Sequence, residues 1–428
     1  MASTAAPRRA GHARQFVARA ASRQFSALAE PNYRLFFLGQ AVSLIGTWMQ
    51  TVGQGWLVLQ LTGSAAALGF VTMLQFLPFT LLSLVGGVLA DRLPKRKTLV
   101  VLQSFATVQA VVLSAIVVLD VVAIWHIYVL AFCLGLTNAL ERPTRQSFFS
   151  DLVPPERLVN AVALNSTILN LARILGPALG GLMIAITGPQ GTFIFNAFSF
   201  AAVLAGYALM DPSRFRTRPR RTGGGSFFRQ IGGGFRYAFS APQPRFILCL
   251  VAFVGLFGYN FNVVVPMVAR FILDAGPAQF GLLTSSLGVG ALISAFTIAG
   301  VAKQSLRLML AAATVFSVLL FALGLSHQYW LSAALLLGLG VTGTAMMTMA
   351  NTSLQLGAPD ELRGRVISIY ILLQAGSTPL GGLLVGQLGS HFGVSTALVV
   401  PASLALAGVL LVAAFHPQVV RFGRLRDA

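Results

Sequence analysis

The chain has 428 residues, of which 56% are hydrophobic and 10% are charged, and its mean hydropathy is +0.79. So little charge cannot cover the water-facing surface of a soluble protein of this length, which predicts a membrane protein. A net charge of +19 would indicate a nucleic-acid partner in a soluble protein. The alternative is that the basic residues mark one side of a membrane.

Stretches of about twenty apolar residues are long enough to cross the hydrocarbon core of a bilayer. The sequence contains twelve of them, so we predict an all-α integral membrane protein. The predicted spans cover residues 34–60, 65–90, 98–119, 122–141, 158–186, 191–210, 245–269, 277–301, 306–326, 329–350, 364–389 and 394–415.

The basic residues are distributed unevenly between the two sides of these spans. All but two of the 30 Lys and Arg residues fall on the termini or on the connections that share their side. The exceptions are Arg270, at a connection on the opposite side, and Arg173, inside the fifth span. Because cationic side chains resist translocation, we expect both termini to be cytoplasmic and nucleic acid not to be a partner.

The chain divides into two sets of six spans. A connection rich in Arg, Pro and Gly separates them, and we interpret it as a flexible, partly helical linker against anionic headgroups. The basic N-terminus resembles a transit peptide in composition, but we favour an amphipathic helix on the inner leaflet. The expected organisation is a basic segment at 1–32, six-helix bundles at 33–211 and 244–416, a linker at 212–243 and a tail at 417–428.

The two sets of spans are similar to each other in sequence. The stretch ALGFVTML around Gly69 resembles QFGLLTSS around Gly281, and Pro177 aligns with Pro379 in two similar Gly-rich stretches. A parallel internal duplication of this kind predicts two bundles that rock around a substrate bound between them near the membrane midplane.

Two motifs carry a family resemblance that spans essentially the whole chain. The segment GVLADRLPKR, which begins at Gly87, resembles the loop between the second and third spans of the major facilitator superfamily, with Pro94 in place of a glycine. In the fifth span, ARILGPALGG resembles the motif of antiporting exporters of that superfamily, with an alanine in place of its first glycine. The residues of this second motif are Ala172, Gly176, Pro177, Gly180 and Gly181. The stretches GTWMQTVGQGWLVLQLTGS and RPTRQSFFSDLVPPERLVN are most similar to the transmembrane secretion effector group, which includes enterobactin-exporter-like proteins.

The resemblance implies two pseudo-symmetric six-helix bundles in the bacterial inner membrane. It also implies a secondary transporter, expected to be a monomer, that exports a drug, siderophore or metabolite in exchange for protons. No enzyme and no cofactor or metal site is expected, and membrane lipids are the other partner. The alternative left open is a lipid translocase or a non-transporting component of a secretion process.

Asp91 stands among basic residues at the cytoplasmic end of the second span. We predict that it forms a latch with Arg92, Arg96 and Arg142 that holds the outward-facing state, and that protonation or substrate binding releases it. A plain positive-inside anchor is the alternative, although it does not explain the aspartate. The expected gating residues are Gly87, Asp91, Arg92, Lys95, Arg96, Arg142 and Arg145.

Arg173 lies near the middle of the fifth span, where a cation costs at least about 2.5–3.5 kcal/mol. Two interpretations stay open: Arg173 binds an anionic part of the substrate, or polar groups such as Asn165, Asn170 or Glu141 neutralise it. The other residues expected in the cavity are Gln50, Gln54, Trp48, Asn165, Asn260 and Asn262. For the amides, interhelical hydrogen bonds are the competing interpretation.

The driving force is less evident from the residues. None of the 11 acidic residues lies at mid-depth. Many members of the resembling family carry an acid near the position of Thr47 and an arginine near that of Ala131, and this chain has neither. Proton exchange is therefore implied by the resemblance alone, and the possible proton carriers are Asp120, Glu141 and His126.

Overall fold

The computed structural model describes residues 25–216, 236–299 and 305–422, and side chains within them except at 83–88, 90–92, 299, 360 and 420–422. Within these ranges every regular element is a helix. The first helices form one half of the molecule: α2 (Pro31–Thr62), α3 (Ala65–Arg92), α4 (Lys95–Val118), α5 (Ile124–Phe148), α6 (Leu158–Thr187) and α7 (Pro189–Leu209).

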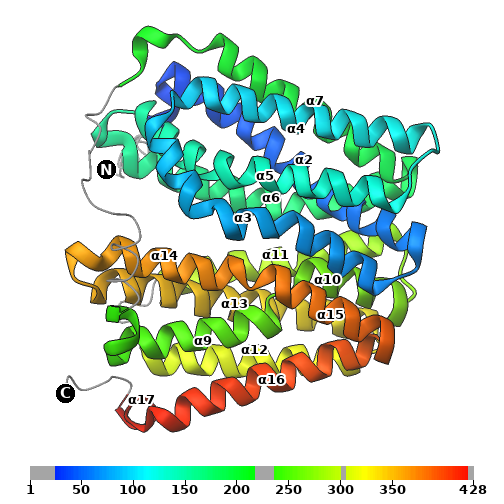
Figure 1. The fold of residues 1–428 in the computed structure, drawn as a ribbon, viewed down its shortest axis with the longest axis vertical. Helices are drawn as coiled ribbons and strands as arrows, with labels where there is room; N and C mark the ends of the chain where they lie inside the picture. Colours follow the sequence, from blue (N-terminus) through cyan, green and yellow to red (C-terminus); the bar gives the residue numbers. More distant parts are fainter. Residues whose placement is uncertain (1–24, 217–235, 300–304, 423–428) are drawn as a thin grey trace, which may run out of the picture.

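The second half lies beside the first (Figure 1). Its elements are α9 (Pro242–Gly258), α10 (Phe261–Met267), a π-helical turn (Val268–Ile272), α11 (Pro277–Ala299), α12 (Leu306–Leu325), α13 (Tyr329–Gly357), α14 (Asp360–Gly376), α15 (Thr378–Phe392), α16 (Val394–Phe415) and α17 (Pro417–Phe422). We call the two groups the N half and the C half. Most of the predicted amphipathic N-terminal helix and most of the predicted linker lie outside the described residues.

All twelve predicted spans are confirmed as apolar helical segments long enough to cross a membrane. The seventh span is broken at Tyr259 and Asn260, and the eleventh at Ser377. The fourth span runs on to Phe148, beyond its predicted end. The predicted end came too early because charged residues interrupt the apolar run that was used to define the span. Charged residues do not end a helix, so the helix continues past them.

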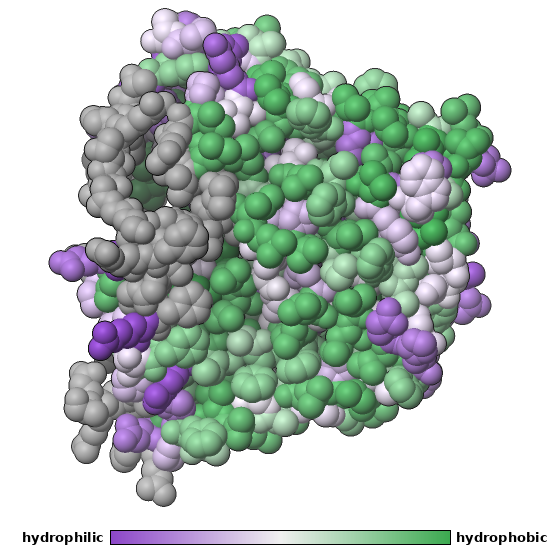
Figure 2. Space-filling model, viewed as in Figure 1, coloured by the Kyte–Doolittle hydropathy of each residue, from purple (hydrophilic) through white to green (hydrophobic). Residues whose placement is uncertain are grey.

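Apolar side chains dominate the outer surface in the view of Figure 2, and hydrophilic ones gather toward the two ends. The basic end is where α3 ends and α4 begins, and the distal end is where α2 ends and α3 begins. A surface of this kind matches hydrocarbon between two polar interfaces. The chain is therefore a multi-pass membrane protein.

Glycines bring the two halves together near the distal end. A Cβ added at Gly181 on α6 would lie 2.8 Å from the Cα of Gly281 on α11, and one added at Gly386 on α15 would lie 2.9 Å from the Cα of Gly69 on α3. Gly69 and Gly281 are the residues that align in the internal duplication, so the two crossings repeat one packing solution. Backbones can approach this closely only where no side chain intervenes.

Candidate substrate and coupling site

Further contacts close the distal end between the halves. The rings of Trp56 on α2 and Phe280 on α11 stack with centroids 5.8 Å apart, and the Arg270 guanidinium lies 6.0 Å from the Trp56 ring centroid. The Ala66 N–H donates a hydrogen bond of 2.8 Å to Ser390 Oγ on α15. Aromatic, cation–π and polar contacts thus join N-half and C-half helices at this end.

The basic end is held differently. Lys95 pairs with Asp151 at 2.7 Å and Arg157 pairs with Glu30 at 2.9 Å, and each pair lies within the N half. Arg96 donates to the backbone carbonyls of the last turn of α7. Among the described residues, every ion pair lies within one half. No described ion pair therefore locks the halves together at the basic end.

The predicted latch stays a prediction. The side chains of Gly87, Asp91 and Arg92 lie outside the described ones. The cations proposed to meet Asp91 have other contacts in this structure: Arg96 binds α7 carbonyls, and Arg142 lies over the Phe79 ring. These contacts belong to the state in which the distal end is closed.

The glycine motif of the fifth span packs mostly within the N half. Ala172 is buried, and Gly176 and Gly180 lie against Trp48 and Met49 of α2. Gly181 and the Pro177 carbonyl of this motif both meet the C half at Gly281, and the nearby Ile174 carbonyl accepts a hydrogen bond of 2.7 Å from Ser285 Oγ on α11. The helix runs unbroken through Pro177, so contact with the other half extends along the motif from Ile174 to Gly181.

Arg173 is half-buried on α6, with its guanidinium 5.9 Å from the Trp48 ring centroid. In the described part of the chain it has no ion pair and no side-chain hydrogen bond. The predicted neutralising groups bind elsewhere: Asn170 donates to the Ser166 carbonyl, and Glu141 pairs with Arg145. Neither Asn170 nor Glu141 is hydrogen-bonded to Arg173 in this structure, and substrate binding and neutralisation by polar groups both stay predictions.

Arg142 on α5 is the second cation of this region. Its side chain is exposed. The guanidinium lies 5.1 Å from the Phe79 ring centroid, and Asn138, one turn earlier on α5, is half-buried.

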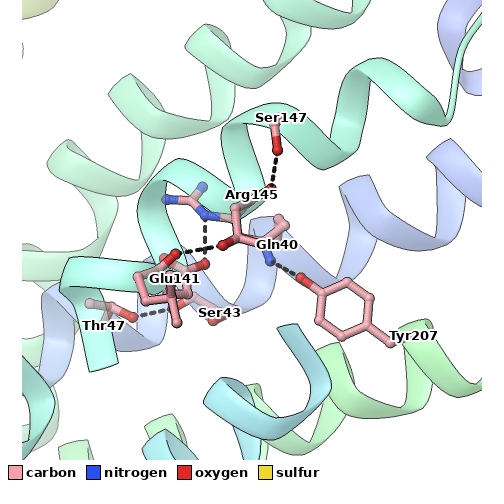
Figure 3. A network of polar contacts seen from close by, with 9 residues as sticks. Gln40, Ser43, Thr47, Glu141, Arg145, Ser147 and Tyr207 are labelled. Atoms are coloured by element: carbon pink, nitrogen blue, oxygen red, sulfur yellow. Dashed lines mark hydrogen bonds and ion pairs between the residues drawn. The ribbon is translucent and has the colours of Figure 1, made fainter. Parts of the chain in front are cut away.

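Polar side chains of α2, α5 and α7 lie near one another in a polar cluster (Figure 3). Glu141 accepts a charge-assisted hydrogen bond of 2.8 Å from Arg145 Nε, and Gln40 donates to the Tyr207 hydroxyl at 3.4 Å. The exposed Thr47 donates to the Ser43 carbonyl. Glu141 and Arg145 are near enough to Tyr207 to act on it electrostatically. A carboxylate in a span is thus held by one arginine and lies next in sequence to another.

Two glutamines of the first span do not line the cavity as predicted. Gln50 accepts a hydrogen bond of 2.6 Å from Asn196 on α7 and donates to Gln109 on α4 at 3.3 Å. Gln54 donates to Gln75 on α3 at 3.4 Å, and both Gln50 and Gln54 are buried. Positions 48 and 50 of a helix point about 200° apart, so Gln50 and Trp48 face opposite sides of α2. The interhelical interpretation is correct for these amides.

The remaining predicted residues are dispersed. Asn260 is buried at the break between α9 and α10, where its amide donates to the Leu256 carbonyl and lies against Gly381. Asn260 is therefore a packing residue and not a cavity residue. Asn165 and Asn262 are half-buried without a described partner.

Two of the three possible proton carriers lie at the distal end. Asp120 is an exposed residue with φ 56° in the connection between α4 and α5. His126 Nδ1 accepts a hydrogen bond of 3.0 Å from the Ala123 N–H and so caps the start of α5. Only Glu141 lies within the polar cluster of the N half.

Sequence reasoning missed several polar partners. Gln109, Asn196 and Tyr207 hold the interior of the N half, and only their scattered positions in other spans could have indicated it. Ser166 and Asn170 share one face of α6 with Arg173, because residues three, four and seven apart lie on one side of a helix. This spacing is visible in the sequence and could have predicted a polar face on the fifth span.

Two halves of six spans, related by duplication and meeting at one end, define the fold of major facilitator transporters. The solved structures agree. A bacterial homologue of the human lysosomal transporter Spinster, inward-facing and occupied, has a TM-score of 0.68 at 14% identity and covers 92% of this chain and 98% of its own. An inward-facing bacterial homologue of the iron transporter ferroportin has a TM-score of 0.65 at 16% identity and covers 90% and 98%.

The sequence matches the transmembrane secretion effector family over residues 22–421, and the chain belongs to this family. It is 24% identical over 365 residues to a staphyloferrin A transporter of Staphylococcus aureus, covering 84% of this chain and 90% of that protein. It is 28% identical over 388 residues to the multidrug efflux pump Tap of Mycolicibacterium fortuitum (87% and 92%). Over 394 residues it is 25% identical to the enterobactin exporter EntS of Escherichia coli (89% and 91%).

Proposed function

We propose that this protein exports a small molecule across the bacterial inner membrane by alternating access, in exchange for protons. The proposal rests on described contacts between the halves that run from the distal end into the spans, as far as the Ser285–Ile174 hydrogen bond, whereas described ion pairs at the basic end stay within one half. A space closed at one end, with charged side chains beside it, is what a carrier needs in its loading state. The relatives that are named as exporters support transport out of the cytoplasm.

The basic end is the cytoplasmic end in this proposal. Arg and Lys residues gather there, as the positive-inside rule requires, and the distal connections carry few. The structure then represents the state that takes up substrate from the cytoplasm. Both described chain ends, at Phe25 and Phe422, belong to helices of this side.

Glu141 is the proposed proton carrier. It is the one acidic residue of the polar cluster between α2, α5 and α7, and its side chain keeps 15% exposure. In this state its Oε1 accepts a hydrogen bond of 2.8 Å from Arg145 Nε. Protonation from the distal side in the opposite state would remove the ion pair and free Arg145, so one proton would alter the charge beside the cavity.

The proposal is tested in everted membrane vesicles with an acidified lumen. Ethidium, chloramphenicol and benzoate are added as a cationic, a neutral and an anionic probe, and proton release is followed by dequenching of a pH-sensitive dye. We expect release with at least one probe, and its loss in Glu141→Gln. Glu156→Gln, at an exposed carboxylate outside the cluster, is the matched control and keeps the response.

Two results would count against the proposal. Full proton release by Glu141→Gln would remove Glu141 as the carrier. Silence with every probe, in vesicles where the inserted protein is verified, would favour a lipid substrate or a role in secretion without transport.

A further inference from the structure

A groove with a volume of about 600 Å³ runs along α15 in the C half. Leucines of α15 at positions 380–388 line it, together with Leu256 and Phe257 of α9. The polar side chains of the lining are Gln387 and His391. A space of this size is within the range of ligand sites. We call it the α15 groove.

The α15 groove faces away from the N half. On the N-half side of α15, a Cβ added at Gly386 would lie 2.9 Å from the Gly69 Cα. An α-helix turns by about 100° per residue, so Leu380, Leu384 and His391 lie on the opposite side of α15. All three side chains are exposed. The groove therefore opens toward the surrounding bilayer and not toward the space between the halves.

The length of the groove matches one leaflet of a bilayer. α15 ends at Phe392 on the distal side, where Trp125 at the start of α5 and Trp330 at the start of α13 are exposed. Exposed tryptophans at helix ends are typical of a membrane interface. From Leu380 to His391 the helix rises by about 16 Å, which is about half of a hydrocarbon core of about 30 Å. The groove thus reaches from the distal interface to about the middle of the membrane.

The apolar and polar parts of the groove are separated along this length. Leu256 and Phe257 lie just before the break in the seventh span, whereas Gln387 and His391 stand one helical turn apart near the distal end of α15. Both polar side chains are exposed. An amide and an imidazole each offer an N–H donor, and phosphate oxygens accept such hydrogen bonds. An apolar channel with donors at its interfacial end has the polarity of an acyl chain below a phosphate group.

We propose that the α15 groove binds a glycerophospholipid of the distal leaflet. One acyl chain lies along the leucines of α15 and Phe257, and the phosphate accepts hydrogen bonds from His391 and Gln387. Lipid tails are as apolar as leucine, so close packing and the headgroup contacts, rather than escape from water, select this lipid. The site lies outside the space between the halves, so the inference goes beyond the proposed function and does not rest on it.

The test is native mass spectrometry of the purified full-length protein, which resolves each bound lipid and gives the affinity of each binding step. The probes are dioleoylphosphatidylethanolamine and dioleoylglycerol, which has the same chains and no phosphate. A phospholipid without net charge is chosen because the basic end would attract anionic lipids. We expect the phospholipid to bind at least about tenfold more tightly in the first step, since hydrogen bonds to a charged group are lost with the phosphate.

Variants then assign the site. Leu384→Trp fills the groove with a larger side chain and should weaken phospholipid binding about tenfold or more. Leu410→Trp, at an exposed leucine of α16 outside the groove, is the matched control and should leave binding unchanged. His391→Leu should remove most of the preference for the phospholipid over dioleoylglycerol. His327→Leu, at an exposed histidine just before α13 and outside the groove, should keep that preference.

Three results would overturn the inference. These are equal affinity of the two lipids for the unsubstituted protein, unchanged phospholipid binding in Leu384→Trp, and equal losses in Leu384→Trp and Leu410→Trp. An unchanged lipid preference in His391→Leu would overturn the placement of the phosphate. Proton release does not enter these measurements, so silence in the vesicle experiment would contradict the proposed function and leave this inference standing.

Discussion

The two halves share a fold but differ in what they hold between their helices. In the N half, Glu141 pairs with Arg145 and an amide chain links Asn196, Gln50 and Gln109 across three helices. In the C half, the buried Ser317 hydroxyl donates to the Ala313 carbonyl of its own helix, and the buried Tyr370 hydroxyl donates to the Met347 carbonyl of α13. The rings of Tyr259 and Phe316 stack at 6.0 Å.

The difference shows which features a duplication keeps. Gly69 and Gly281 both pack against the opposite half. A side chain at either position would push the two helix backbones apart and disrupt the helix crossing. Pro177 aligns with Pro379, which places Ala375 opposite Arg173 in the alignment. The glycine crossing is present in both halves, whereas Arg173 has only Ala375 at the aligned position of the C half. The N half therefore carries the proposed binding and coupling chemistry, and the C half packs against it.

The largest effect is expected where the halves meet. Gly181→Leu would place a side chain where a Cβ already lies 2.8 Å from the Gly281 Cα, and backbone atoms cannot yield as a flexible side chain can. The distal end could then not close, and the initial export rate in vesicles should fall about tenfold or more. Gly364→Leu, where an added Cβ meets nothing within 4 Å, is the control and should keep its rate. A normal rate in Gly181→Leu would contradict the role of this crossing.

We expect a smaller effect, on stability, from substitutions in the interior of each half. Asn196→Leu removes the side-chain donor to Gln50 and leaves the buried Gln50 amide oxygen without that partner. We expect this loss to lower the free energy of unfolding by about 1–2 kcal/mol. Ser317→Ala removes a hydroxyl that bonds only within its own helix and should cost about 0.5 kcal/mol or less. Thermal unfolding of the two variants in detergent measures the contrast. Equal losses would mean that the amide chain is no more important than a local hydrogen bond.

The sequence predicted the spans and the family because hydropathy and charge asymmetry act over many residues at once. It could not place individual partners. Gln50 and Trp48 were grouped by nearness in the chain, although a helix turns them to opposite sides, and Arg173 could not be separated from neutralising amides without their coordinates. Polar residues interrupt the apolar runs at Asn260 and Ser377, but a polar residue inside a span does not by itself distinguish a break from a continuous helix.

We propose that the space between the halves opens at the basic end and that this end faces the cytoplasm. Ser166, exposed on the Arg173 face of α6, is the position to test it. Ser166→Cys is made in a background where Cys133 and Cys249, the free cysteines of the structure, are replaced. A membrane-impermeant maleimide should label it in everted vesicles and leave it unlabelled in right-side-out vesicles of the same preparation. Labelling only in right-side-out vesicles would contradict an opening toward the cytoplasm.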